Sequence, residues 1–400
     1  MINTEENIGI QGSTNPLKGL NSKNFAAGLA SGFLAVTGPP ALILEAAANG
    51  NFTSEQTILW LFSVYFFGGL FSILMPLYYR MPIVGAHTIT GVAFLVTVTS
   101  QFTYSELIGA YLFSGILMLL VGYLGAFSKL LSYVPKELIA AMLAGMITKY
   151  MANFIVSISS LPLVGGISFL TYLLFSKLNT RIPPIVAAIT TGFALLFLTY
   201  PISIAGTTTN FVIPQLQVPV FNPLSFIAVS IPLALLILSN DAAVGIGALE
   251  QNDYKPQTNK LISFSGLFSM TTSLFGGQSA NVAGMMSAIC SDREAGPKEH
   301  RYMGAVISGG ILLLFGIFSW KLVPFIQALP QAFISLLIGF ALLGVFANSL
   351  NMSFSKSTIK LSAAVTYIIA LSNITFFSIS SPIWALLVGT LVAKYIEKNN

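Results

Sequence analysis

The sequence contains few charged residues, and this shortage alone excludes most classes of protein. Asp, Glu, Lys and Arg make up 8% of the 400 residues, whereas 55% are hydrophobic and the mean hydropathy is +0.82. Soluble proteins carry about 25% charged residues because their surfaces face water. No stretch between the apolar runs is long enough to bury a core of its own. We therefore expect an all-α polytopic membrane protein without a soluble domain.

Cysteine and histidine are almost absent as well. The single cysteine, Cys290, excludes an internal disulfide and a cysteine metal cluster. The two histidines, His87 and His300, lie too far apart in the sequence to indicate a zinc site. No paired acids, nucleophile–base set or cofactor motif suggests an intramembrane enzyme. We accordingly predict no metal, no cofactor and no enzymatic activity. The net charge of +5 does not indicate nucleic-acid binding, because the basic residues are distributed by membrane side.

Apolar runs follow one another along the whole chain after a polar tail, residues 1–23, which lacks the order of a cleaved signal. A helix needs roughly 20 apolar residues to cross the hydrocarbon core, which gives about fourteen spans. We place them near 24–48, 54–78, 82–99, 105–127, 135–157, 160–176, 183–200, 224–250, 258–275, 277–290, 302–322, 330–350, 357–373 and 380–397. A Pro- and Thr-rich linker, 201–223, separates a first repeat of seven spans (24–200) from a second one (224–397).

The few basic residues indicate how the chain is oriented. Cytoplasmic loops of membrane proteins carry an excess of Lys and Arg. With a cytoplasmic N-terminus, nearly all of the 18 Lys and Arg fall on that side. On the other side only Lys321 is expected, and the loops 49–53, 100–104, 158–160, 201–223 and 374–379 contain no Lys or Arg. We therefore expect both termini in the cytoplasm and residues 201–223 outside, as in a multi-pass protein of a bacterial inner membrane.

A weak internal repeat links the two halves. The stretch from Pro135 to Asn153 matches the stretch from Pro330 to Asn348 at one constant offset, with the proline, an isoleucine and the closing Ala-Asn in common. The first copy starts on the cytoplasmic side and the second on the outer side. Because seven is an odd number of spans, the second repeat is expected to be inverted relative to the first.

The third span of each half is interrupted. Pro82 and Gly85 discourage a continuous helix, so we expect an extended run over 82–86 and a helix that begins near His87. The run Gly276–Ala280 repeats the design, with Asn281 as the expected N-cap of the following half-helix. Paired interrupted segments point to the binding site of a transporter. The two helix N-termini would oppose each other at the midplane and favour an anion, although neither half-helix contains Arg or Lys.

Asp241 and the two broken segments supply the candidate site. An acid near the middle of a span is costly and usually marks a proton or substrate path, so Asp241 is the predicted proton carrier. A purely structural acid is the alternative, and His87 and Glu45 are the next candidates for the proton, although Glu45 lies close to the outer interface. The predicted substrate-binding residues are His87, Thr88, Thr90, Asn240, Gln278, Ser279, Ala280 and Asn281.

Three features of the sequence can also be explained by helix capping, packing or position alone. His87 and Thr88 could simply cap the half-helix or pack. Lys149, in the fifth span, is expected to extend towards the outer surface, with pairing to an acid as the alternative. Gly38-Pro39-Pro40 is expected to kink the first span, because a proline deletes a backbone hydrogen bond.

Several short motifs resemble the benzoate/proton symporter family, over about residues 24–395. They are Tyr79-Arg80-Met81-Pro82, Val134-Pro135 with Ala140–Gly145, Gly245–Ala248 and Ser287–Cys290. Nucleobase and sulfate transporters share this seven-plus-seven inverted-repeat fold. The resemblance implies a core domain of spans 1–4 and 8–11, which holds the substrate, and a gate domain of spans 5–7 and 12–14, against which the core moves. One departure is Ser239-Asn240-Asp241, where the family commonly carries Gln-Asn followed by Pro-Gly.

Together these observations predict a proton-coupled secondary active transporter that works by alternating access. It is expected to be a symporter of a small organic anion such as benzoate or a related aromatic carboxylate. A nucleobase or inorganic-anion transporter of the same fold stays open, because nucleobase relatives carry an acid in span eight. A passive anion channel is the other alternative, but it would need no central acid. The expected partners are the anionic substrate, protons and the lipid bilayer, and a homodimer stays open.

Overall fold

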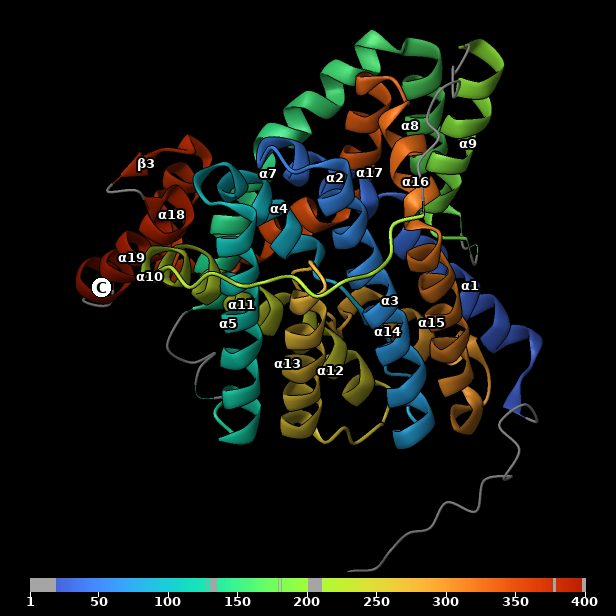
Figure 1. The fold of residues 1–400 in the computed structure, drawn as a ribbon, viewed down its shortest axis with the longest axis horizontal. Coiled ribbons are helices and arrows are strands. Elements are labelled where there is room, and N and C mark those ends of the chain that lie inside the picture. Colours follow the sequence, from blue (N-terminus) through green and yellow to red (C-terminus); the bar gives the residue numbers. More distant parts are fainter. Residues whose placement is uncertain are drawn as a thin grey trace, which may run out of the picture.

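The structure, a computed structural model, describes residues 19–127, 129, 135–178, 180, 182–200, 211–376 and 379–397. Nearly all of this chain is helical (Figure 1). The predicted tail up to residue 18, Val134, and residues 201–210 of the predicted linker lie outside the described residues.

Helices occur in every range in which the apolar runs predicted a span. The first half contains α1 (Ser22–Thr37), α2 (Pro39–Asn49), α3 (Ser54–Tyr79), β1 (Gly85–Ala86), α4 (Ile89–Val98), α5 (Tyr104–Tyr123), α7 (Lys136–Ser160), α8 (Pro162–Lys177) and α9 (Pro184–Thr199). The second half contains α10 (Pro223–Ser225), α11 (Ile231–Leu236), α12 (Ala243–Gln251), α13 (Thr258–Leu274), β2 (Asn281–Val282), α14 (Gly284–Ser291), α15 (Tyr302–Ile317), α16 (Ser319–Gln327), α17 (Gln331–Ser353), α18 (Lys360–Ser372), β3 (Thr375–Phe376), β4 (Ile379–Ser380) and α19 (Ser381–Val392). Two π-helical turns, Phe226–Ser230 and Ile237–Ala242, join α10, α11 and α12 into one long stretch.

Seven helical stretches of the described chain are long and apolar enough to cross a membrane. They are Ser22–Asn49, Ser54–Tyr79, Tyr104–Tyr123, Lys136–Ser160, Pro223–Gln251, Lys298–Ile317 and Gln331–Ser353. Further apolar helices, among them α8 and α9, are shorter. The chain is therefore a mostly helical, multi-pass membrane protein.

The first long stretch bends at Gly38, where the Gly-Pro-Pro sequence predicts a kink. α1 ends one residue before Gly38 and α2 begins at Pro39, because a proline is tolerated in the first turn of a helix, where no backbone N–H is needed. A Cβ atom at Gly38 would lie only 2.8 Å from the Cβ of Ala341 in α17. The glycine therefore allows the bend to pack directly against α17.

The helices pack in two groups. We call α1–α5 and α10–α15 the first helical group; within it α3 packs on α15, and α5 packs on α13. The second helical group comprises α7–α9 and α17–α19, with α7 packed against both α17 and α18. The groups meet where α2 contacts α17, α4 contacts α7 and α1 contacts α9.

The constant offset of the sequence repeat recurs at the element boundaries. The same number of residues separates the first residues of α7 and α17, the last residues of α3 and α13, the first residues of α4 and α14, and the last residues of α8 and α18. Three of these four pairs lie outside the stretch from which the repeat was first recognised. The two halves thus place their elements along the chain in the same order and at the same spacing.

Strands β1 and β2 show how the two halves are oriented at their closest point. They pair antiparallel, with Gly85 opposite Val282 and Ala86 opposite Asn281. Ala86 and Asn281 are equivalent positions of the repeat, because they are separated by the same offset. Equivalent residues that face each other in opposite chain directions are related by a local two-fold axis. This axis passes between the two broken segments.

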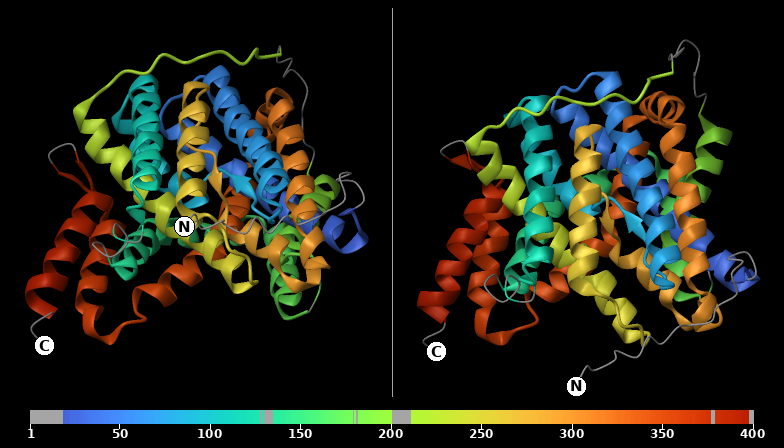
Figure 2. Two further views of the ribbon diagram at one scale, coloured as in Figure 1. Left: turned by 90° about the horizontal axis from the view of Figure 1, so that it is seen from below. Right: turned by 60° about the horizontal axis from the view of Figure 1, so that its bottom comes forward.

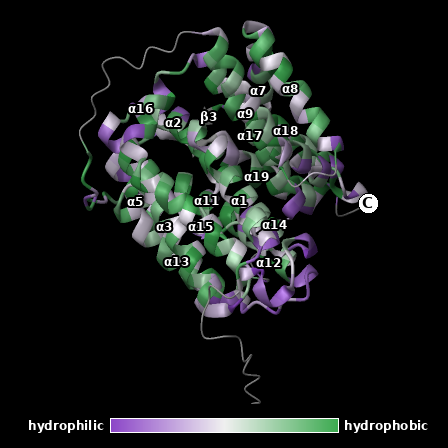
Figure 3. Cartoon of the chain, turned by 90° about the vertical axis from the view of Figure 1, so that its right-hand side faces the viewer, coloured by the Kyte–Doolittle hydropathy of each residue, from purple (hydrophilic) through white to green (hydrophobic). Residues whose placement is uncertain are grey.

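Residues 211–222 cross the helix ends on one face of the molecule (Figure 2). The Gln217 N–H donates to the Leu274 carbonyl oxygen at 2.7 Å, and the Val220 N–H donates to the Ser105 carbonyl oxygen at 2.9 Å. These bonds tie the segment to the end of α13 and the start of α5. Hydrophilic residues gather on the other side of the molecule, in the loops beyond α12 and α14 (Figure 3).

Cysteine labelling tests the predicted orientation of these two faces. In a Cys290→Ala background, we expect Gln215→Cys to react with a membrane-impermeant thiol reagent from outside the cell. We expect Asn259→Cys, at the start of α13, to react only when the cytoplasmic face is exposed. The cysteine-free background supplies the control. Labelling of both positions from the same side would contradict the predicted topology and the inversion of the second half.

Candidate substrate-binding cavity

A cavity of about 470 Å³ lies between the two helical groups. The first group contributes residues from α1, α2, α4, the π-helical turn 237–242, α12 and α14, and the second contributes α7 and α17. The polar residues on the side of the first group are His87, Thr90, Asn240 and Asp241. Those on the side of the second group are Lys136, Asn348, Ser349, Asn351 and Ser355.

The first broken segment forms as predicted, with an extended run that leads into a half-helix. Gly85 is required here, because a Cβ atom would lie 2.5 Å from the Phe71 ring and 2.8 Å from the Gly68 carbonyl oxygen. The chain can therefore pass close to α3 in extended form. Thr88 then caps α4, and its hydroxyl oxygen accepts a hydrogen bond from the Gly91 N–H at 3.0 Å. The half-helix begins at Ile89, two residues after the predicted start.

The second broken segment forms too, but its predicted boundaries are wrong. The strand is Asn281–Val282 rather than Gly276–Ala280, and α14 begins at Gly284. Asn281 does not cap the helix, because its backbone pairs with β1 and its side-chain amide donates to the Val282 carbonyl oxygen at 3.0 Å. Ala283 occupies the N-cap position instead and offers no side-chain hydrogen bond. The first N–H groups of α14 are therefore left without a cap.

The first turns of both half-helices reach the cavity wall. Ile89 and Thr90 of α4 and Gly284, Met285 and Met286 of α14 line it. The N–H groups of a first helical turn have no partner within their own helix, and the helix dipole places about half a positive charge there. Two such ends on one cavity favour a negatively charged group without any basic side chain.

His87 and Asp241 bring unpartnered polar atoms to the same wall. His87 is 4% exposed, and its ring packs edge-on against Tyr65 with 5.0 Å between the ring centroids. Neither ring nitrogen of His87 has a hydrogen-bond partner among the described residues, and neither does Oδ2 of Asp241. The Thr88 hydroxyl lies near the Asp241 carboxyl. Buried polar atoms normally have partners, so these are available to a ligand or to water.

Asp241 lies in a π-helical turn, which its sequence did not suggest. The turn covers Ile237–Ala242 and also contains Asn240, whose amide donates to the Ser239 hydroxyl at 3.3 Å. Single π-helical turns inside α-helices are rare and occur frequently at functional sites. This turn brings Asn240 and Asp241 together to the cavity wall.

The remaining predicted site residues lie behind this wall rather than on it. Thr88, Gln278, Ser279, Ala280 and Asn281 are all 0% exposed. Their hydrogen bonds hold the broken segments in place. Trp60 Nε1 donates to Gln278 Oε1 at 2.6 Å, the Thr88 N–H donates to Ser279 Oγ at 3.2 Å, and the Ala280 N–H donates to Ser269 Oγ at 3.2 Å.

The hydrogen bond between Thr88 and Ser279 gives a stability prediction. Ser279→Ala leaves the buried Thr88 N–H without its acceptor, and we expect a loss of about 1–3 kcal/mol in the free energy of unfolding. Affinity for the transported anion should change little, because Ser279 does not reach the cavity. Thermal unfolding and ligand titration of the same purified variant measure both effects. A variant as stable as the wild type would show that this contact does not hold the two segments together.

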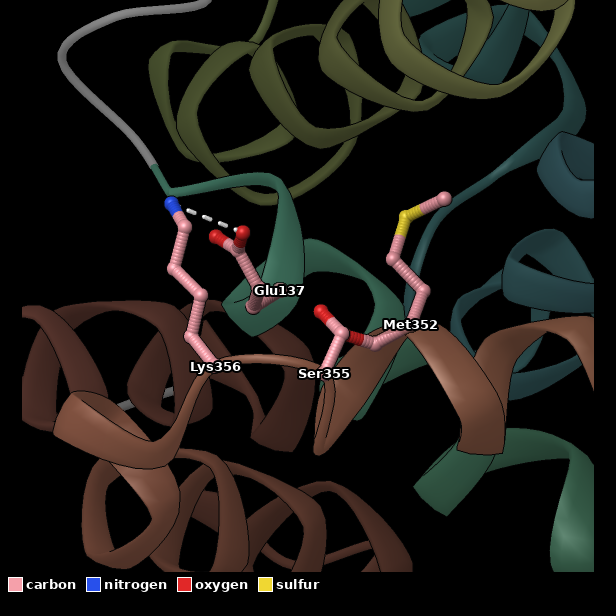
Figure 4. A network of polar contacts seen from close by, with 4 residues as sticks. All are labelled: Glu137, Met352, Ser355 and Lys356. Atoms are coloured by element: carbon pink, nitrogen blue, oxygen red, sulfur yellow. Dashed lines mark hydrogen bonds and ion pairs between the residues drawn. The ribbon is translucent and has the colours of Figure 1, made fainter.

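Sequence reasoning missed the contribution of the second helical group to the cavity. Asn348 closes the repeat motif, and that match was the only signal that could have pointed to it. Asn351, Met352 and Ser355 are exposed and mark the open end of the cavity, beside Lys136. At this end Lys356 Nζ forms an ion pair with Glu137 Oε1 at 2.8 Å, close to Met352 and Ser355 (Figure 4). Lys136 therefore places positive charge near the entrance, whereas the charge of Lys356 is balanced by Glu137.

The described residues contain no group of three His, Cys, Asp or Glu side chains that could hold a metal ion. Glu45 and Lys149 do not line the cavity; they lie on α2 and α7.

Comparison with known proteins adds a family and a fold. The family model described as benzoate membrane transport protein matches residues 19–395. The chain is 29% identical to the inner membrane protein YdcO of Escherichia coli (strain K12) and 26% identical to the benzoate membrane transport protein of Acinetobacter baylyi. Each alignment spans 366 residues, which cover 90% of this chain and 93% of the relative.

Two solved structures share the fold at low sequence identity. The transmembrane domain of the cyanobacterial bicarbonate transporter BicA superposes with a TM-score of 0.59 at 15% identity, over 94% of this chain and 98% of that domain. The murine anion transporter Slc26a9, in its inward-facing state, superposes with a TM-score of 0.62 at 12% identity, over 94% of this chain and 68% of that protein. Both similarities show the arrangement of the helices.

Proposed function

The chain belongs to the benzoate membrane transport protein family, and from this premise we propose that it is a proton-coupled symporter of a small aromatic carboxylate, benzoate or a close relative. The relatives named above are membrane proteins, and one of them is a benzoate transporter. The transported anion binds in the cavity between the two helical groups. The observation that carries the proposal is the meeting of two half-helix N-termini, His87 and Asp241 on one cavity wall.

The carboxylate group of the substrate is held by the polar wall. It faces the first-turn N–H groups of α4 and α14, each of which contributes at best about 2 kcal/mol to the binding of a negative charge. His87 offers a ring N–H to the same group, since both of its nitrogens lack partners among the described residues. Neither half-helix carries Lys or Arg, so the anion is held by N–H groups rather than by a fixed ion pair.

The apolar body of the substrate is held by the rest of the cavity. Leu34, Ala35, Pro39, Ala140 and Met286 line it from both groups. These side chains gain from covering an aromatic ring, whereas a hydrated inorganic anion would leave them facing water. A nucleobase would need paired donors and acceptors along its edge. The volume of about 470 Å³ is within the usual range for small-molecule sites.

Asp241 couples transport to protons. A buried carboxylate beside the substrate carboxylate would repel it, so Asp241 binds a proton when the anion binds. In this neutral form it donates a hydrogen bond to the substrate. After the substrate dissociates, the proton dissociates too, and the protein returns to its starting conformation with neither of them bound. Binding of one ligand thus depends on the other, as symport requires.

Alternating access follows from the two helical groups. The first group acts as the core domain that carries the site, and the second as the gate domain. The fold then comprises fourteen spans in two inverted repeats of seven, with spans 3 and 10 broken. With both termini cytoplasmic, Lys136 and Ser355 lie at the cytoplasmic end, so the cavity of this structure faces inwards.

A thermal-stability screen tests the choice of substrate. A ligand that binds only the folded state stabilises it by about 2.7 kcal/mol at 100 times its Kd. We expect benzoate to raise the unfolding temperature of the purified protein and uracil, sulfate and bicarbonate to leave it unchanged. A shift with bicarbonate or uracil, and none with benzoate, would replace this proposal with the inorganic-anion or nucleobase alternative.

A further inference from the structure

Glu45 and Lys149 are charged residues within helical stretches, and the proposed function leaves both unused. Glu45 is half-buried on α2, in the first helical group, and Lys149 is exposed on α7, in the second. The Lys149 ammonium acts electrostatically on the Glu45 carboxylate, although the two do not form a direct ion pair. The same carboxylate also acts electrostatically on Tyr150, which follows Lys149. Opposite charges on the two groups thus attract each other across the boundary.

The repeat relates this pair to the cavity. The offset that separates Ala86 from Asn281 also separates Glu45 from Asn240, Ala46 from Asp241 and Tyr150 from Val345. All three of the second-half positions, Asn240, Asp241 and Val345, line the open cavity. The local two-fold axis between β1 and β2 therefore places Glu45, Ala46 and Tyr150 at the equivalent position on the opposite side of the site.

That opposite side is closed in this structure. Ala46 is 0% exposed, and its carbonyl oxygen accepts a hydrogen bond from the Thr99 hydroxyl at 2.8 Å. Tyr150 packs against the main hydrophobic cluster of the protein. Its counterpart Val345 is half-buried and packs on the same cluster, but it also lines the open cavity, which Tyr150 does not. Equivalent positions of the two repeats thus take an open and a closed form in one molecule.

We propose that Glu45, Ala46 and Tyr150 line a second, outward-facing mouth of the carboxylate site, and that Glu45 and Lys149 form the gate that closes it. This inference rests on the alternating-access function proposed above. When the first group moves relative to the second, Glu45 separates from Lys149 and the outer mouth opens. The Lys149 ammonium then faces the entering carboxylate. A partly exposed pair of this kind shifts such an equilibrium by about fivefold at most.

Cysteine accessibility measures the opening directly. The reporter is Ala46→Cys in a Cys290→Ala background, labelled in right-side-out membranes with an impermeant thiol reagent; a cysteine fits a small buried site. We expect slow labelling of this protein and a faster rate, by up to about fivefold, after Glu45→Gln or Lys149→Gln. The combined exchange of Glu45→Lys and Lys149→Glu should restore slow labelling, because the attraction is rebuilt with its signs reversed.

Ala47→Cys is the matched control reporter. Ala47 is 2% exposed, and its counterpart Ala242 is 0% exposed and does not line the described cavity. Its labelling should stay slow in every variant. A second reporter, Tyr150→Cys on the other group, should respond as Ala46→Cys does and replaces it if that variant fails to fold.

Two outcomes would overturn the gate. One is an unchanged labelling rate at Ala46→Cys and Tyr150→Cys after both charge removals. The other is an equal increase at Ala47→Cys, which would indicate general loosening. The labelling needs no substrate, so a failure of benzoate to bind would count against the proposed function alone. Unchanged labelling in a protein that does transport benzoate would count against the gate alone.

Discussion

Asp241→Asn should abolish the accumulation of benzoate driven by a proton gradient while leaving benzoate exchange across the membrane intact. The asparagine is permanently neutral, so it can still donate a hydrogen bond to the substrate carboxylate. It cannot bind and release a proton during the transport cycle, so the proton gradient cannot drive uptake of the substrate. In proteoliposomes, the variant should exchange benzoate by counterflow at a rate comparable to the wild type. It should show no additional saturable uptake of benzoate when the outside is made acidic.

Asp253→Asn provides the matched control, because Asp253 lies in the turn after α12, away from the cavity. It should behave as the wild type in both assays. Benzoic acid crosses lipid on its own, so the rates in protein-free liposomes are subtracted. Normal gradient-driven uptake by Asp241→Asn would move the proton to another residue, with His87 and Glu45 as the next candidates.

Thr90→Asp should weaken benzoate binding by at least about 100-fold, since two unit charges 4 Å apart repel by about 4 kcal/mol at an effective dielectric constant near 20. Thr90 is 6% exposed, lies in the first turn of α4 and lines the cavity. An acid in a first helical turn stabilises the helix, so the fold should survive. The carboxylate would occupy the place where we expect the substrate anion.

Thr90→Asn has nearly the same shape without the charge and is the control for this variant. Both variants should unfold at similar temperatures, while only the aspartate should lose affinity in a benzoate titration. Equal affinities in the two variants would remove the α4 N-terminus from the site. The same comparison separates a loss of the Thr90 hydroxyl, which contacts Thr88 at 3.1 Å, from a repulsion between charges.

Much of the fold could be predicted from the sequence because its signals are local. Apolar runs of membrane-spanning length, Pro82 and Gly85 before His87, and the Gly38 kink each act within a few residues of where they stand. The structure has helices, breaks and bends at those positions. The repeat at Pro135 and Pro330 was weak as a sequence match and became informative only when other element boundaries showed the same offset.

The parts that could not be predicted depend on contacts between distant segments. The sequence predicts Asn281 as a helix N-cap. Its backbone instead pairs with Ala86 in a strand, and the helix begins at Gly284. The sequence predicts that Gln278 and Ser279 line the cavity, but hydrogen bonds with Trp60 and Thr88 hold them behind the cavity wall. A single polar run cannot show which of its residues face the cavity. That choice depends on the helix packed behind it.

The contribution of the second helical group follows the same logic. Asn348 lies in an ordinary apolar helix and Ser355 in the loop after it, and apart from the repeat match at Asn348 nothing nearby in the sequence singles them out. They reach the cavity because α17 packs beside α2. The π-helical turn at Asp241 likewise has no signature in its composition. Its presence is a property of the packed helix.

The initial rate of radiolabelled benzoate uptake into proteoliposomes, with and without an acidic outside, tests the central claim most directly. The rate in protein-free liposomes is subtracted at each concentration. The account predicts a saturable rate that rises when the outside is acidic and returns to its basal value when a protonophore collapses the gradient. A saturable uptake rate that does not change with the proton gradient, or an uptake rate that does not saturate at all, would contradict proton-coupled transport by this protein.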